Sequence, residues 1–186
     1  VVEMIEYWTT ASAPSFRLRP STILDLHRSA LEGLSHYAGN YRPAGIEIGG
    51  SKHTPVPAHL VPQHVEELCD YVNDNWTRSP VRLSSYVMWR LNWIHPFTDG
   101  NGRTSRALAY LILCCRLGYR LPGTNTLPEQ IAQNKRPYYL ALEAADGGDL
   151  SPLEDLVAGA IAQQLLEIHE AARSDEYRES RPPTLH

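Results

Sequence analysis

Cysteine is scarce in this sequence, and no apolar run is long enough to cross a membrane. The three cysteines, Cys69, Cys114 and Cys115, are odd in number and include an adjacent pair, which argues against a disulfide framework. We therefore expect buried, reduced thiols and a cytoplasmic protein. The longest apolar run, residues 107–115, falls far short of the roughly 20 residues of a membrane-spanning helix, so we expect no membrane partner.

An excess of positive charge is also lacking. The 186 residues carry a formal net charge of −4 at pH 7, which excludes the broad basic field typical of nucleic-acid-binding domains, and we expect no nucleic-acid partner. Internal repeats, coiled-coil heptads and low-complexity linkers are absent as well. With 42% hydrophobic and 20% charged residues, the chain has the balance of one globular domain with a full core.

The sequence does contain a dense group of functional side chains in residues 94–106, Ile-His-Pro-Phe-Thr-Asp-Gly-Asn-Gly-Arg-Thr-Ser-Arg. Apolar runs with helical spacing flank this stretch, so we interpret it as helix, tight loop and helix. Pro96 ends the first helix near His95, because the residue before a proline is pushed out of the α region. Gly100 and Gly102 let the backbone turn sharply and come close to a ligand.

The residue types in this loop indicate chemistry on a phosphate. A helix that starts near Arg103 offers unpaired N–H groups and the positive end of its dipole to an anion, and Arg103 and Arg106 share one face of its first turn. Asp99 is a hard oxygen ligand suited to a Mg²⁺ ion that already carries phosphates. His95 titrates near neutrality and can accept a proton from a hydroxyl. Taken singly, His95 could be a helix-capping residue and the arginines a solvated helix face; together they predict a phosphate-transfer site.

Apolar residues at helical spacing predict an all-α protein. The first of the predicted helices contains His27, for which we expect a structural polar role rather than catalysis. The helix over 128–145 should kink near Pro137. The charged residues 172–186 should form a frayed tail. The predicted helices begin at residue 21 and then cover residues 57–75, 81–94, 103–117, 128–145 and 151–171.

Residues 39–57 cannot be helical, because they hold four glycines and three prolines. Ile46, Glu47 and Ile48 alternate like a short strand, a Gly-Gly turn follows, and residues 52–54 can return. This pattern predicts a small hairpin that forms a mobile surface flap. The alternative is an ordinary connecting loop.

The 94–106 stretch resembles the signature of the Fic (filamentation induced by cAMP) family, His-Pro-Phe-x-Asp/Glu-Gly-Asn-Gly-Arg-x-x-Arg, and meets every fixed position. Residues 39–42 (Gly-Asn-Tyr-Arg), the run from 56 to 75 and the tyrosine-containing run 136–149 also resemble the family. The resemblance implies an all-α Fic-type bundle of about six to eight helices with a β-hairpin flap over the active site. Its divisions are an N-terminal extension at 1–20, a catalytic domain at 21–171 with the flap at about 41–57, and a polar tail at 172–186.

The same resemblance implies a protein adenylyltransferase that uses ATP and Mg²⁺. His95 would take the proton of a Ser, Thr or Tyr hydroxyl of a target protein, whose oxygen attacks the α-phosphorus while pyrophosphate leaves. The flap residues Ile46, Glu47 and Ile48 would hold the target by strand addition. The remaining roles implied are Mg²⁺ binding by Asp99, phosphate binding by Gly100, Asn101, Gly102, Arg103 and Arg106, and contact near the adenine by Tyr139 and Asp146.

Many family members are restrained by a helix with Ser/Thr-x-x-x-Glu-Gly/Asn, whose glutamate pairs with the last arginine of the signature. Residues 28–33 (Arg-Ser-Ala-Leu-Glu-Gly) come nearest, but Arg28 takes the Ser/Thr place and the segment lies before the flap. We therefore expect the restraint to come from an antitoxin-like inhibitory chain or from an N-terminal inhibitory helix missing from this sequence. A homodimer is left open.

Two other functions stay open at this point. One is a nucleotide-binding adaptor that docks proteins through the flap without chemistry. The other is transfer of a different nucleotide, such as UMP from UTP, or transfer in reverse. Kinase-like relatives usually carry Lys at the second glycine of the signature, so Gly102 argues against that variant.

Overall fold

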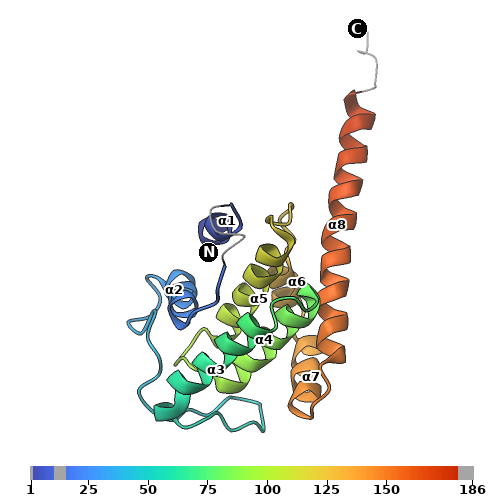
Figure 1. Cartoon of the computed structure of the whole chain (residues 1–186). Helices are drawn as coiled ribbons and strands as arrows, with labels where there is room; N and C mark the ends of the chain where they lie inside the picture. The colour runs from blue at the N-terminus through green and yellow to red at the C-terminus, as the bar shows by residue number, and fades with distance from the viewer. Residues whose placement is uncertain (1, 11–15, 180–186) are drawn as a thin grey trace.

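The computed structural model describes residues 2–10 and 16–179 of the chain. Within this part there are eight α-helices, one short 3₁₀ helix (η2) and no strand (Figure 1), which confirms the all-α fold class. The elements in chain order are α1 Val2–Thr10, α2 Pro20–Leu31, η2 Ala58–Leu60, α3 Val61–Asp74, α4 Pro80–Ile94, α5 Asn101–Leu117, α6 Leu127–Gln133, α7 Lys135–Asp146 and α8 Ser151–Glu179.

Helix α5 forms the centre of the molecule. It is apolar on all sides, 13 of its 17 residues are buried, and α1, α2, α4 and α6 pack around it. A helix that is apolar all round is stable only when neighbours cover every face. The three cysteines are free thiols buried in or beside this core, as expected. The start of α5 is therefore held rigidly, and the signature residues lie there.

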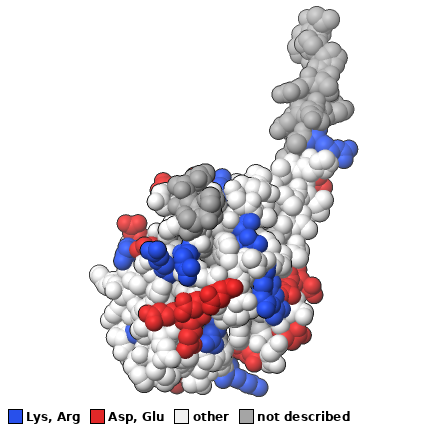
Figure 2. Space-filling view, in the orientation of Figure 1, with Lys and Arg blue, Asp and Glu red and all other residues white. Residues whose placement is uncertain are grey.

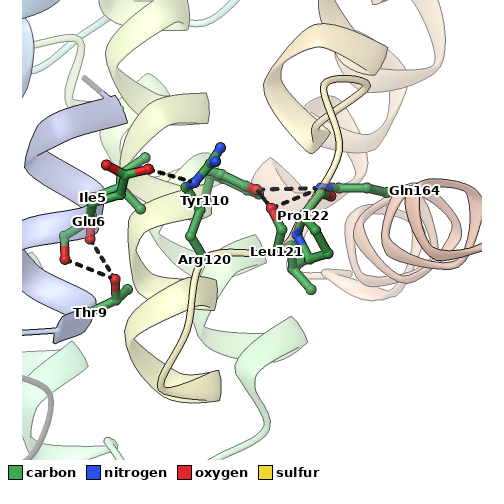
Figure 3. Close-up of polar contacts among 8 residues, drawn as sticks. All are labelled: Ile5, Glu6, Thr9, Tyr110, Arg120, Leu121, Pro122 and Gln164. Carbon is green, nitrogen blue, oxygen red and sulfur yellow. Dashed lines mark hydrogen bonds and ion pairs between the residues drawn. The ribbon is translucent and has the colours of Figure 1, made fainter. Parts of the chain in front are cut away.

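The first helix and the loop after α5 are tied to the same core. Ile5 packs in the core, and Glu6 of α1 forms an ion pair with Arg120 at 3.1 Å (Figure 3). On the other side of the loop, the Nε2 of Gln164 in α8 donates to the carbonyl of Pro122 at 2.6 Å. The far end of α5 is thus connected to both the first and the last helix.

Two predicted helices differ from the observed ones. The kink expected at Pro137 is a break at Asn134, whose extended backbone separates α6 from α7, while Pro137 lies in the first turn of α7 where proline is tolerated. Helix α8 continues past 171 to Glu179 and projects from the body (Figure 1). Residues 172–179 contain no glycine or proline to end the helix, so this part of the predicted tail at 172–186 is helical; its remainder, 180–186, lies outside the described residues.

The predicted β-hairpin is absent from residues 41–57, which form an extended loop with a turn at Gly49 and Gly50. One turn hydrogen bond runs from the N–H of Ser51 to the carbonyl of Ile48 at 3.1 Å. Glu47 is exposed and its neighbours Ile46 and Ile48 are half-buried. A two-stranded hairpin with so little apolar area is marginal by itself, which explains why the strand pairing does not form.

The surface carries both signs of charge. On the face shown in Figure 2, Lys and Arg side chains and Asp and Glu side chains lie in small interspersed groups. Within the described part of the chain, no helix is both long enough and apolar enough to cross a bilayer.

Candidate active site

His95 lies at the C-cap of α4 in a left-handed backbone conformation (φ 51°, ψ 57°). It is the one residue other than glycine with positive φ in the part of the chain that the structure describes. Its N–H donates to the carbonyl of Leu91 at 3.0 Å, and Phe97, fully buried, anchors the loop that follows. A non-glycine residue adopts this strained conformation only where its surroundings hold it, and such positions cluster at functional sites.

The ring of His95 is oriented as a neutral base. Its Nδ1 is 3.2 Å from the carbonyl oxygen of Asn92, which can only accept, so Nδ1 carries the proton. Nε2 therefore keeps its lone pair, and among the described residues it has no hydrogen-bond partner. Burial lowers the pKa of His95 below the ordinary 6.5, and the nearby charge of Arg42 acts in the same direction. The imidazole is consequently neutral at pH 7 and ready to take a proton.

The loop after His95 leads into the first turn of α5. Gly100 is the N-cap of α5 with φ 76°, a conformation that glycine adopts without a steric penalty. Asn101 is 3% exposed, and its side chain bonds both the N–H and the carbonyl of Phe97, at 2.9 and 2.8 Å. Asn101 therefore braces the loop with its side chain, and only its backbone N–H is left for an anion. The first N–H groups of a helix have no acceptor within the helix.

The two signature arginines differ in their surroundings. Arg103 forms an ion pair with Asp99 at 2.9 Å, and both side chains are largely exposed (40% and 71%), so the pair contributes little stability and can open. Arg106 is 8% exposed, and no hydrogen bond or ion pair to it is found within the described residues. A Cβ on Gly102 would lie 3.1 Å from its Nη1, so the glycine leaves room for this guanidinium. A buried, unpaired positive charge at a helix N-terminus favours an anion strongly.

Comparison with known proteins identifies the family. Residues 17–113 match the Fic/DOC family. The chain belongs to the Fic/DOC family. It is 35% identical over 139 residues to the protein adenylyltransferase fic-1 of Caenorhabditis briggsae, covering 73% of this chain and 26% of the relative, and 29% identical over 174 residues to the protein adenylyltransferase Fic of Drosophila willistoni, covering 92% and 33%.

The structural comparison agrees with this assignment. Residues 134–508 of Caenorhabditis elegans Fic-1 superpose with a TM-score of 0.72 at 27% identity, over 92% of this chain and 50% of that one. This Fic/DOC chain spans about a quarter to a third of the length of the curated relatives named above.

The residues predicted near the adenine lie on α7 beside α4. Tyr139 is 53% exposed, whereas Tyr138 is fully buried. Asp146 accepts a hydrogen bond from the indole N–H of Trp89 at 2.8 Å, so its carboxylate is fixed on the α4 side of α7. The sequence did not predict this hydrogen bond between Trp89 and Asp146, which are 57 residues apart.

A buried polar cluster behind the Fic/DOC signature escaped the sequence analysis. The Nδ2 of Asn92 lies 2.7 Å from the hydroxyl oxygens of both Ser105 and Tyr138 and equally close to the carbonyl of Met88, so its two N–H groups are shared among three acceptors. The hydroxyl of Ser105 in turn donates to the carbonyl of Gly102 at 3.1 Å. These bonds fix the first turn of α5 relative to α4 and α7. Asn92 also supplies the carbonyl that holds the ring of His95, so the cluster links the base to the anion-binding end of α5.

Proposed function

We propose that this Fic/DOC chain is a protein adenylyltransferase that moves AMP from ATP to a Ser, Thr or Tyr hydroxyl of a target protein. The hydroxyl oxygen forms a bond to the α-phosphorus, the bond from that phosphorus to the bridging oxygen breaks, and pyrophosphate leaves. The hydroxyl proton passes to Nε2 of His95. The catalytic unit we propose is residues 21–171, and the names of the relatives support the activity.

The observation that carries this proposal is that an unprotonated ring nitrogen and a guanidinium without a counter-charge lie in the same region. His95 presents an unprotonated Nε2, and Arg106 holds a buried guanidinium without a carboxylate partner in the described part of the chain. Both lie at the junction of α4 and α5. A base and an anion site so arranged favour attack of a hydroxyl on a phosphate, because phosphoryl chemistry depends mainly on positioning and charge stabilisation.

The phosphates of ATP would lie at the N-terminus of α5. The backbone N–H groups of Asn101 and Gly102 and the guanidiniums of Arg103 and Arg106 would bind them. Asp99 fits a Mg²⁺ ion as its one protein ligand, since its exposed carboxylate is held only by Arg103 and a backbone N–H, and magnesium in nucleotide sites takes most of its ligands from phosphates and water. The ion, when bound, neutralises phosphate charge; no group of three or more candidate ligands exists within the described residues.

The target would lie on the flap. No strand pairs with Ile46, Glu47 and Ile48 in the described part of the chain, and apart from the carbonyl of Ile48, which accepts from Ser51, their backbone groups are available to an extended segment. Such a segment would supply the strand pairing that the flap alone does not form. Tyr139 and Asp146 would lie near the adenine. Restraint by an antitoxin-like chain or an N-terminal helix, a homodimer and a cytoplasmic location remain predictions from the sequence.

Labelled ATP tests the proposal directly. With a lysate as the source of targets, label from the α-phosphate should appear on protein and label from the γ-phosphate should not. His95→Ala should abolish the transfer while ATP still binds, and His169→Ala, an exposed histidine on α8, should leave it unchanged. Binding of ATP without any transfer would favour the adaptor, and preferential transfer from UTP would change the nucleotide but keep the mechanism.

A further inference from the structure

Arg42 is a buried arginine whose hydrogen bonds all go to backbone carbonyl oxygens. It is 3% exposed, and no carboxylate pairs with it in the described part of the chain. Its Nε donates to the carbonyl of His95 at 2.8 Å, its Nη1 to that of Ala44 at 2.9 Å, and its Nη2 to that of Val56. Its backbone N–H donates to the carbonyl of Pro96 at 2.9 Å. One side chain thus joins its own segment, at Ala44, to Val56 and His95, which lie 14 and 53 residues further along the chain.

The three carbonyls belong to the two ends of the flap and to the base. Ala44 and Val56 lie near the two ends of the flap, and His95 ends α4. A second flap residue, His53, lies with Nε2 2.7 Å from the carbonyl of Trp93, to which it donates. The last carbonyls of a helix have no partners within it, and here flap residues supply the donors. The flap and the end of α4 therefore form one hydrogen-bonded unit.

This arrangement needs a guanidinium. Burial of a charge without a counter-charge is unfavourable, and burial lowers the pKa of Arg42 below its ordinary value. A guanidinium offers five N–H donors in a fixed planar fork, whereas a lysine ammonium is a compact group that cannot serve all three carbonyls in this geometry. Simple core filling would be served better by an apolar side chain. An unfavourable buried charge at the junction of flap and base indicates a role in function.

We propose that Arg42 is a positioning residue that holds the flap and the catalytic histidine in fixed positions relative to each other. The bond to the carbonyl of His95 restrains the ψ angle of that residue, which is in a strained conformation that depends on its surroundings. The hydrogen bonds to the carbonyls of Ala44 and Val56 fix both ends of the flap to the same guanidinium. The inference rests on the proposed function, because the relative positions of flap and His95 matter only if a hydroxyl on a docked target must reach Nε2 of His95.

Arg42→Lys is the variant that tests this role, with Arg78→Lys at an exposed arginine before α4 as the matched control. We expect kcat/KM for the target protein to fall by about tenfold or more, with contributions from both kcat and the target KM, because at least two hydrogen bonds of the fork are lost. The Kd for ATP should stay within about twofold, since Arg42 contacts none of the proposed phosphate-binding residues. Arg78→Lys should change neither quantity.

The tautomer of His95, measured by ¹⁵N NMR of labelled histidine, gives a second reading that does not depend on transfer. The wild type should show one tautomer with the proton on Nδ1, and Arg42→Lys should show averaging between the two tautomers. An unchanged tautomer together with unchanged kcat/KM overturns the role of Arg42, and so does a loss of ATP binding equal to the loss of transfer, which would indicate general unfolding. If the wild type transfers no nucleotide, the proposed function fails and the positioning role fails with it; a tautomer that still responds to Arg42→Lys then shows only that Arg42 orients the ring of His95.

Discussion

At the scale of single residues, the neutral state of His95 sets the pH dependence of the proposed reaction. Burial is the main cause of its lowered pKa, and the charge of Arg42 adds to the effect. A base must be unprotonated to act, and kcat/KM reports the pKa of the free enzyme, so kcat/KM for the target should rise with pH and level off with a midpoint below 6.5. The measurement is the rate of α-label transfer between pH 5 and 8, with ATP affinity determined at each pH. A midpoint above 7 would contradict the neutral state of His95 at pH 7.

His27 provides a separate prediction about stability. It is fully buried; its Nδ1 accepts the N–H of Gly39 at 2.9 Å, its Nε2 lies 3.0 Å from the carbonyl of Asp99, and its ring stacks on Phe97. Burial lowers its pKa, so the unfolded chain binds this proton more readily than the folded one. The stability is fully present above pH 6.5 and decreases as the pH falls below it, with a slope of up to about 1.4 kcal/mol per pH unit.

The test is urea unfolding of the wild type and His27→Gln between pH 7 and 5. The variant should be less stable at pH 7 but should lose less stability on acidification, because one of the buried histidines no longer takes up a proton on unfolding. His169→Gln, on an exposed part of α8, should keep the slope of the wild type. Equal slopes for His27→Gln and the wild type would show that His27 does not titrate in this range.

At the scale of elements, the start of α5 depends on Gly100. Its φ of 76° is unfavourable for other residues, and a Cβ there would lie 2.7 Å from Cδ1 of Leu31 in α2. Gly100→Ala should therefore destabilise the fold by about 1–3 kcal/mol and lower transfer activity, because α2 or the anion-binding turn must move. Gly159→Ala, inside α8 with nothing within 4 Å, should instead stabilise by about 0.5–1 kcal/mol. Thermal unfolding of both variants separates the two effects, and the double variant Gly100→Ala/Leu31→Ala should relieve the contact but not the backbone strain.

The elements also show which parts of the fold the sequence could predict. Helical apolar spacing and the proline after His95 are local signals, and α4 and α5 begin and end close to the predicted residues. The prediction of a hairpin at 41–57 was wrong. Alternation over three residues does not show whether a strand can bury enough apolar area to be stable. The break at Asn134 was missed because the extended backbone of an asparagine before a helix leaves a weaker signal than a proline.

At the scale of the whole molecule, the contacts that sequence reasoning missed are those between residues distant in the chain. His27 lies 72 residues before the carbonyl it contacts, and Arg42 lies 53 residues before the carbonyl of His95. Periodicity and local motifs carry no information on such pairs. A signal existed for each residue. A histidine within an apolar helix face fits the structural role predicted for His27, and an arginine near the start of a loop rich in glycine and proline could have suggested an anchor. The chemistry of the 95–106 loop was predictable because its parts are neighbours in the chain.

The whole-chain arrangement also predicts how this Fic/DOC chain responds to changes in its acidic residues. An inhibitory glutamate of the kind found in the family would have to pair with Arg106, yet no carboxylate does so within the described residues. Glu32, in the segment nearest to the inhibitory pattern, is exposed at the end of α2, although its neighbour Leu31 lies against the start of α5. Glu32→Gln should therefore change the rate of α-label transfer by less than about twofold, since an exposed charge that pairs with neither signature arginine contributes little. Strong stimulation by this substitution would mean that Glu32 reaches Arg106 in solution and that the chain restrains itself.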